Sequence, residues 1–529
     1  MSRLSGWKRA ALGAAVVATA VMAGACSNGG GAATGSAVVA SGTLEHGGSA
    51  VVIGPVAPVT LDPATVFNES EEGGEVLSAI YDVLFTIGPT GNIQPAIAQS
   101  FTTTDGKSWT LKIRPGVRFS DGTPFNAAAV KAEWLRIENP KTPGVNSQYL
   151  QDVTSMTVVN DLTLSVQLSA VNYQFKQAVS TSALTWIPSP TAVTKYGANF
   201  GNHPVGAGPY ELSSMTPSVQ VVVKRNPYYW QKGLPYLNQL TFKFNPDEQQ
   251  SVEAVETGEA DMTSPVDVVI QRTAKEAGLD VATIPIAGIF GWFFNESKPP
   301  FNNILAREAV YDAVDEQTIN DDVFDGLIKA PLSIVAQSSP LFDPSATFAP
   351  DNPKRAQQLF NQLAAEGKPV KFTLPYPDTT IQREQATALE TQLAAYKNVS
   401  IEIEPENATN YDAFVETGNY GMLELGLFGS DPEPIIYDAL HTGGGANFAH
   451  VSNPAIDAAV QAGRSTPSLA ARRADYATLM KALNSDYVAL WAMSPSSEDG
   501  SAVYSPAFKA PVMYGDGTPL WDTWGRLAK

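Results

Sequence analysis

The chain is 529 residues long and 44% hydrophobic, and its 34 basic residues stand against 53 acidic ones, giving a formal net charge of −19. This scattered acidic charge excludes nucleic acid as a partner, and a single cysteine excludes an internal disulfide framework. The length is too great for one hydrophobic core, so two or three domains are expected.

The first 25 residues have the layout of a secretory signal peptide. Arg3, Lys8 and Arg9 precede an apolar stretch, residues 10–25, which is too short and too rich in Ala and Gly for a permanent membrane span. We therefore predict that residues 1–25 are removed during export. Loss of three basic residues leaves 31 basic against 53 acidic ones, a net charge of about −22.

The only cysteine, Cys26, follows directly. Residues 23–26 (AGAC) resemble a bacterial lipobox, although Ala23 stands where Leu, Val or Ile is usual. An unpaired thiol is unusual in an exported protein, which favours a lipid-modified Cys26 over a plain signal peptide with an unused cysteine. Residues 27–48 are rich in Gly, Ala and Ser and predict a flexible tether. We interpret segment 26–48 as a lipid anchor and its tether.

After the tether, the chain alternates between strand and helix patterns. The spacing of Val76, Ile80 and Leu84 predicts a helix over 75–85. A second helix is predicted over 126–137, with Asn126 as its N-cap. Strands are predicted over 49–53, 108–113, 156–158 and 162–168. The alternation indicates an α/β fold with long excursions.

From residue 206 the pattern changes. Two β-rich stretches, 210–223 and 240–244, predict a hairpin-like pair of strands, and a helix over 252–257 ends before Gly258. Further helices are predicted over 306–315, 353–365, 382–396, 454–463 and 469–484. Strands are predicted over 370–374, 400–403 and 487–491. This second alternation indicates a second α/β lobe.

Three sequence blocks in this succession are typical of one protein family. The first comprises 93–101 (IQPAIAQSF), 105–114 (DGKSWTLKIR) and 116–125 (GVRFSDGTPF). The second comprises 206–210 (GAGPY), 225–230 (RNPYYW) and 258–261 (GEAD), and the third 294–295 (FN), 299–301 (PPF) and 307–310 (REAV). Over nearly the whole mature chain they resemble the extracellular solute-binding proteins of family 5, the dipeptide, oligopeptide and nickel-binding group.

Most residues of these blocks are expected to be structural. Gly116 and Gly208 set turns, and Trp109 and Phe119 lie in the core. Arg114 is expected to form an ion pair. The blocks therefore identify the fold rather than the ligand.

The resemblance implies an α/β fold of the periplasmic-binding-protein type (type II, cluster C). Such a fold has two lobes, an additional inserted domain, and a hinge that closes the lobes over the solute. Domain I would comprise residues 49–76, 197–285 and 492–529, domain II the insertion 77–196, and domain III residues 286–491. A monomer is expected.

The resemblance also points to a ligand-binding loop. In peptide-binding relatives a loop of the third domain places an Asp against the α-ammonium group of the ligand, because a buried cation needs a counter-charge. The corresponding loop here is 428–434 (FGSDPEP), so Asp431 is the candidate, with Phe428 and Gly429 beside it. The family pattern has one more residue before the final acidic-Pro pair, and an ungapped match puts Ser430 at the ammonium position instead.

Other ligand contacts are predicted from the same resemblance. Asn68 and Glu69 lie in a loop where family members bring polar groups of the first domain to the ligand, and Trp292 near the hinge and Asn447 after a triple glycine are further candidates. Dipeptide-selective relatives hold the ligand carboxylate with an Arg in the segment that here reads LPYPDT (374–379), which has none. Longer peptides, whose C-terminus need not be fixed, fit better, and so do non-peptide solutes.

The predicted function is capture of a peptide or peptide-sized solute outside the cell and delivery to the permease and ATPase subunits of an ABC importer, with no cofactor. The four histidines are too dispersed to show zinc-ligand spacing, and no hydrolase, Walker A or EF-hand motif is present, which argues against an enzyme. Two alternatives share the fold: a metal chelate, haem, glycan or opine as cargo, or a surface sensor of such a solute. Cys26 would hold the protein at the outer face of the cytoplasmic membrane.

Overall fold

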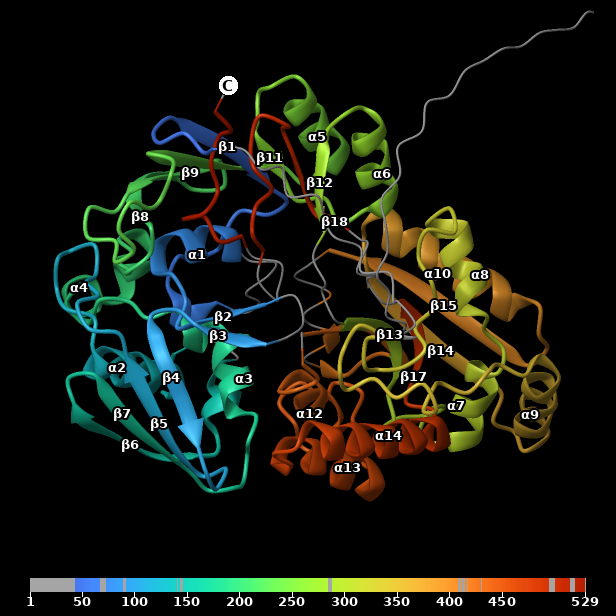
Figure 1. Cartoon of the computed structure of the whole chain (residues 1–529). Coiled ribbons are helices and arrows are strands. Elements are labelled where there is room, and N and C mark those ends of the chain that lie inside the picture. Colours follow the sequence, from blue (N-terminus) through green and yellow to red (C-terminus); the bar gives the residue numbers. More distant parts are fainter. Residues whose placement is uncertain are drawn as a thin grey trace, which may run out of the picture. The chain divides into compact units, whose positions relative to one another are not determined.

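The computed structural model describes residues 43–528 except 67–72, 89–91, 140, 143–145, 284–287, 408–410, 412–413, 416, 430, 494–499 and 514–518. Residues 40–529 form one compact unit, which is mixed α/β (Figure 1). Four residues singled out from the sequence, Cys26, Asn68, Glu69 and Ser430, lie outside the described residues.

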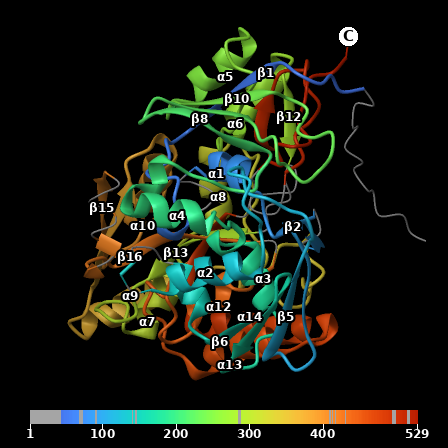
Figure 2. The ribbon, with the colours of Figure 1, turned by 90° about the vertical axis from the view of Figure 1, so that its left-hand side faces the viewer.

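The largest sheet has seven strands in the order β12-β18-β11-β1-β10-β9-β8. They are β1 (Ser49–Gly54), β8 (Tyr210–Thr216), β9 (Gln220–Arg225), β10 (Gln239–Phe244), β11 (Met262–Thr263), β12 (Asp280–Thr283) and β18 (Gly500–Tyr504). Helix α6 (Val268–Glu276) packs on β12 and β18, and α5 (Glu248–Glu256) packs on β11, beside α6 (Figures 1 and 2). Three separate stretches of chain thus share one sheet, as a discontinuous first domain requires. The domain boundaries themselves stay a prediction.

The stretch that the pattern predicts as one strand, 210–223, is two strands. The chain turns back between β8 and β9, where Ser218 has a φ of 59° and the N–H of Val219 donates to the carbonyl of Thr216 (3.0 Å). Pro217 in this turn has no N–H for a sheet ladder and ends β8. The apolar alternation continues on both sides of the turn, which is why the pattern conceals it.

The insertion carries a four-stranded antiparallel sheet in the order β4-β5-β7-β6. Its strands are β4 (Ala98–Thr103), β5 (Ser108–Ile113), β6 (Val153–Asn160) and β7 (Thr163–Leu168). Helix α2 (Ala127–Glu138) packs against it, and the Asn126 side chain accepts the N–H of Ala129, so the predicted cap is confirmed. Helix α1 (Gly74–Tyr81) packs on β8 and β9 of the seven-stranded sheet. The other short elements before β8 are η1 (Pro63–Thr65), β2 (Phe85–Ile87), β3 (Ile93–Pro95), η2 (Asn146–Leu150), α3 (Phe175–Ser180), η3 (Ala183–Thr185), α4 (Pro190–Tyr196) and η4 (Gly197–Asn202).

A three-stranded antiparallel sheet and a parallel strand pair organise the remaining part. The sheet has the order β16-β13-β17, from β16 (Met422–Phe428), β13 (Gly288–Phe294) and β17 (Ala489–Met493), and the pair is β14 (Val370–Pro377) with β15 (Val399–Glu406). The helices are α7 (Ile304–Tyr311), α8 (Glu316–Val323), α9 (Pro353–Ala365), α10 (Thr380–Ala394), α12 (Ile435–Leu440), α13 (Pro454–Ser465) and α14 (Leu469–Asp486). The helix predicted over 306–315 is present as α7 but ends earlier, at Tyr311, and Asp315 instead caps α8 by accepting the N–H of Thr318.

Each of the three larger sheets has its own group of buried side chains. Phe242 and Trp521 belong to the core of the seven-stranded sheet, and Trp491 belongs to that of the three-stranded sheet. Trp109 and Phe119 are 3% and 0% exposed in the core of the insertion, which confirms the structural role predicted for these two family residues. Separate cores permit the parts of the chain to move as bodies.

Arg114 forms no ion pair with the described residues, so that prediction is wrong. Its guanidinium lies over the Trp230 ring, 4.6 Å from the centroid, and its Nε donates to the carbonyl of Ala96 (3.2 Å). An aromatic face replaces the expected carboxylate. Two family blocks, 105–114 and 225–230, meet at this contact, which gives both a structural role.

A buried polar cluster lies at the end of α1. The indole N–H of Trp230 donates to Asp82 (2.9 Å), and the Tyr229 hydroxyl lies within hydrogen-bonding distance of Asp82 (3.3 Å) and Asp522 (3.0 Å). Burial and the neighbouring charge of Asp522 raise the pKa of Asp82 to about 7. Folded Asp82 therefore keeps its proton at pH values where an unfolded carboxyl is ionised.

We expect stability to fall as the pH rises from about 4.5 to about 8. The folded-state pKa of Asp82 lies above its unfolded value, so its contribution is present at low pH and is lost as the pH rises through about 7. The melting temperature should be higher at about pH 5 than at about pH 8 by about 2 °C or more. Asp82→Asn, which keeps an acceptor for Trp230, should reduce this difference. Calorimetry that shows no fall over this range would contradict the prediction.

Candidate functional site

The candidate ligand loop follows β16 at a junction between two sheets. Gly288 of β13 lies opposite Phe428 of β16, and Phe290 lies opposite Met493 of β17. The start of β13 and the ends of β16 and β17 therefore lie at the same end of the three-stranded sheet. At this end of the sheet the chain connects twice with the seven-stranded sheet, once between β12 and β13 and once between β17 and β18. The loop after β16 thus begins where the two sheets are connected.

Asp431 in this loop is buried and bound to an arginine. Nη1 and Nη2 of Arg472, on α14, donate to its Oδ2 and Oδ1 over 2.8 and 2.6 Å. Oδ1 also accepts the N–H of Glu433 (3.0 Å), and Nε of Arg472 donates to the carbonyl of Gly463 (3.0 Å). A buried bidentate pair is among the strongest side-chain contacts. Asp431 therefore already has a cationic partner within the chain.

A second buried ion pair holds the same loop. Nε of Arg464, on α13, donates to Oε2 of Glu433 (3.0 Å), and its guanidinium stacks 3.3 Å from the centroid of the Tyr437 ring. Burial raises the pKa of Glu433 to about 7 against the opposing effect of Arg464. Two arginines from two helices thus fix residues 431–433, which have little freedom to rearrange around a solute.

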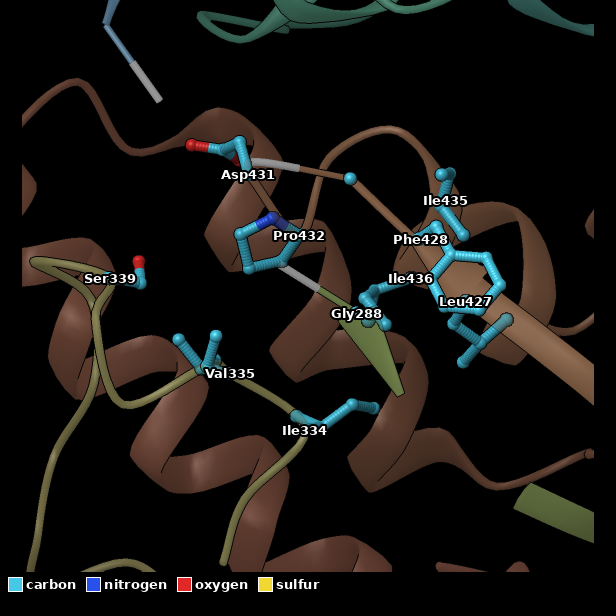
Figure 3. A pocket seen from close by; sticks show the side chains of 12 residues that line it. Gly288, Ile334, Val335, Ser339, Leu427, Phe428, Asp431, Pro432, Ile435 and Ile436 are labelled. Atoms are coloured by element: carbon cyan, nitrogen blue, oxygen red, sulfur yellow. The ribbon is translucent and has the colours of Figure 1, made fainter. Parts of the chain in front are cut away.

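A cavity of about 20 Å³ lies beside the loop (Figure 3). Its wall is formed by Phe428, Asp431 and Pro432 on one side and by Ile334 and Val335 on the other. This volume holds about one water molecule and is far too small for a peptide. Two larger hollows, of about 400 and 490 Å³, lie on the first-domain side among residues 57–244, and none of the predicted ligand residues that the structure describes lines them.

The other predicted residues lie in different surroundings. Trp292 is 2% exposed and belongs to the core beside the three-stranded sheet, on the strand next to the loop. Phe428 packs edge-on against Phe290, with ring centroids 4.5 Å apart. The Asn447 side chain donates to the carbonyls of His441 (3.0 Å) and Val451 (2.8 Å) and accepts the N–H of Val451 (2.8 Å). Asn447 therefore holds its own loop together.

Glu424, on the strand before the candidate loop, is a residue that the sequence analysis did not single out. It lies on β16 opposite Trp292 and is partly buried. Burial alone raises the pKa of its carboxyl to about 7. Its side chain forms no hydrogen bond or ion pair with the described residues, although its main-chain carbonyl accepts the O–H of Tyr411 (2.9 Å). One charged side chain inside the apolar strand MLELGLF was the available indication.

Contacts also join the insertion to the α13 region. The N–H of Tyr173 donates to the carbonyl of Arg464 (3.0 Å), and the Gln174 side chain donates to the carbonyl of Thr466 (3.3 Å). A Cβ added at Gly445 would lie 2.1 Å from Oε1 of Gln148. The predicted second and third domains thus touch, and the triple glycine allows one of these contacts to be close.

Among the described residues, no group of three or more His, Cys, Asp or Glu side chains is arranged to hold a metal ion. None of the described helices combines the length and apolar composition that crossing a bilayer requires.

Comparison with known sequences gives a family. The model of the bacterial extracellular solute-binding proteins, family 5 (middle region), matches residues 92–447. The glutathione-binding protein GsiB of Salmonella typhi is 30% identical over 305 residues. The match covers 57% of this chain and 59% of GsiB, so it spans less than two thirds of the relative.

Comparison with solved structures gives the fold. DppA from Helicobacter pylori, in complex with the peptide STSA, has a TM-score of 0.79 at 19% identity, with 92% of this chain and 99% of that chain covered. AgaA from A. tumefaciens R10, in complex with agropinic acid, has a TM-score of 0.78 at 21% identity, with 91% and 99% covered. The predicted type II periplasmic-binding-protein fold is confirmed, and the chain belongs to the bacterial extracellular solute-binding proteins of family 5.

Proposed function

We propose that this chain is the solute-binding component of an ABC importer, which captures a peptide or peptide-sized solute between its lobes and hands it to the permease. The observation that carries the proposal is the family match over 92–447 on a fold whose chain crosses twice between two sheets, as a hinge requires. The protein would be a monomer, exported and held to the outer face of the cytoplasmic membrane by a lipid on Cys26. The proposed activity is binding and release without chemistry.

The basic residues near β14 support a long rather than a short peptide. Residues 374–379 contain no arginine, and the nearest one along the chain, Arg383, forms an ion pair with Asp378. No free guanidinium is thus offered there to the carboxylate of a dipeptide. An oligopeptide whose C-terminus is left unclamped fits this arrangement better.

The pairing of Asp431 bears on how the solute is held. Arg472 occupies both oxygens of Asp431. This arrangement supports the alternative alignment with the family pattern, in which Ser430 takes the position of the residue that binds the ligand ammonium. A ligand role for Asp431 stays a prediction. Without a free Asp in the loop, a peptide ammonium is not required, and this favours a non-peptide solute as the second candidate.

The experiment that tests the proposal is mass spectrometry of what co-purifies with residues 27–529, expressed without the lipid anchor. Each compound found is then titrated while the melting temperature is measured, since a bound solute raises it by mass action. A set of short peptides that each raise the melting temperature would support peptide import. Finding a single non-peptide compound would leave the family assignment intact and replace the proposed solute. Finding no compound that raises the melting temperature would contradict solute capture.

Gly445→Leu should hinder closure and weaken solute binding. The new side chain would overlap Gln148 across the contact between the insertion and the third domain, so the open form would gain population and the apparent affinity would fall. Gln148→Ala in the same variant removes the obstacle and should restore part of the affinity. Small-angle scattering that shows no opening, or no rescue by Gln148→Ala, would contradict the prediction.

A further inference from the structure

One face of the three-stranded sheet is accessible near the candidate loop. Successive residues of a strand point to opposite faces, so Glu424, Gly426 and Phe428 share a face of β16 with their cross-strand neighbours Trp292 and Phe290. On the other face, Leu423 and Leu427 are buried, and Trp292 on the shared face is buried in the core as well. On the shared face, Gly426 is exposed and Glu424, Phe290 and Phe428 are only partly buried. The part of this face nearest the candidate loop, from Glu424 to Phe428, is therefore a wall that a solute can reach.

Two aromatic rings occupy the position next to Glu424 on this wall. A Cβ added at Gly426 would lie 2.3 Å from the Phe428 ring and 3.0 Å from the Phe290 ring. Glycine at this position thus lets the two rings meet over the strand, at the next position on the same face as Glu424. Aromatic faces flanking a carboxylate are suited to a cation, which gains both cation–π attraction and charge-assisted hydrogen bonds.

The chain itself supplies no cation to Glu424. Every Lys, Arg and His between residues 43 and 528 lies within the described residues, because the gaps contain none. None of these side chains pairs with Glu424, and burial is what raises the pKa of its carboxyl to about 7. Two buried carboxylates of the nearby loop, Asp431 and Glu433, each have an arginine. A buried carboxylate without a partner is costly and persists where something else provides the charge.

The wall also faces the predicted hinge. Met493, opposite Phe290, packs in a small cluster with Val268 of α6, a helix of the seven-stranded-sheet part, and with Phe324 and Ile328. The accessible end of the face therefore lies next to the junction of the two sheets. In the proposed function this junction is where lobes close over a solute.

We propose that Glu424, with the rings of Phe290 and Phe428, forms a subsite for a cationic group of the solute, an ammonium or a guanidinium. The inference rests on the proposed function and adds the charge of the cargo to it. The cation comes either from the N-terminus of a peptide or from a side chain, and in both cases Glu424 supplies the counter-charge that the paired Asp431 does not.

The test uses a synthetic tripeptide library whose central residue is Lys, Arg, norleucine or Glu, each made with a free and with an acetylated N-terminus, together with yeast extract. Residues 27–529 and the Glu424→Gln variant are incubated with the mixture, and the retained compounds are quantified by mass spectrometry. We expect the wild type to enrich cationic compounds and the variant to lose about tenfold or more of that enrichment. Loss confined to free N-termini identifies the α-ammonium, and loss confined to Lys and Arg identifies the side chain.

Glu402→Gln is the matched control, because Glu402 is exposed on β15 and the substitution is the same. It should leave the enrichment unchanged. Equal enrichment by the wild type and Glu424→Gln overturns the inference, and so does a wild type that retains only neutral or anionic compounds, while solute capture itself then stands. If the wild type retains no compound at all, the proposed function is overturned, and this inference with it.

Thermal unfolding provides a second measurement that needs no solute. Removal of a buried charge without a partner should leave the melting temperature of Glu424→Gln equal to or above that of the wild type. A melting temperature lowered by several degrees would mean that Glu424 has a structural partner and would overturn the inference.

Discussion

Replacement of Asp431 with alanine should lower the free energy of unfolding by about 3–5 kcal/mol, because it leaves the buried guanidinium of Arg472 without its carboxylate. The side chains of Asp431 and Arg472 are 9% and 5% exposed, so water does not replace the lost partner. The loop and α14 would both lose their main connection. The measurement is the urea midpoint and melting temperature of the transition that includes the third-domain core.

A double replacement separates structure from ligand binding. Asp431→Leu with Arg472→Met removes both charges and should recover most of the lost stability, since apolar side chains often replace a buried ion pair without cost. If Asp431 serves only the fold, the double variant also recovers solute affinity. Recovered stability with affinity still lost would instead support the predicted ligand role of Asp431. A stable Asp431→Ala variant would contradict the structural role.

Gly208→Ala should be almost as damaging, at about 3 kcal/mol or more. An added Cβ would lie 2.5 Å from the carbonyl oxygen of Ala79 and 2.5 Å from the carbonyl carbon of Ile80, both main-chain atoms of α1. The N–H of Gly208 also donates to the carbonyl of Ile80 (2.8 Å), so the two segments cannot separate without losing this bond. Thermal and urea unfolding measure the effect.

Gly116→Ala is the comparison that isolates the cause. Gly116 has a φ of 82° and nothing within 4 Å of an added Cβ, so the substitution should cost only about 1 kcal/mol of backbone strain. Both glycines belong to family blocks. Gly116 is needed for its backbone conformation, whereas Gly208 is needed because the main chain of α1 leaves no room for a side chain. Equal losses of stability in the two variants would contradict this distinction.

The family blocks were informative because their residues act locally or pack in the same way throughout a fold. Trp109 and Phe119 were expected in the core and are buried there. Elements with a clear period and a cap, such as α2 after Asn126, were predicted closely. Two boundaries were not, because the strand pattern before Pro217 continues after it, and because Asp315, read as the end of a helix, caps the start of α8.

By itself, the sequence determined the family, the α/β class and the place of the candidate loop after an apolar strand, since these depend on residue order and periodicity. Only the tertiary structure decided which carboxylates have partners. Asp431 meets Arg472 across 41 positions of the chain, whereas Glu424, a few residues before it, pairs with no basic residue of the described chain. The charge state of a buried group depends on burial and on which distant side chains fold against it, and neither is written in the local pattern.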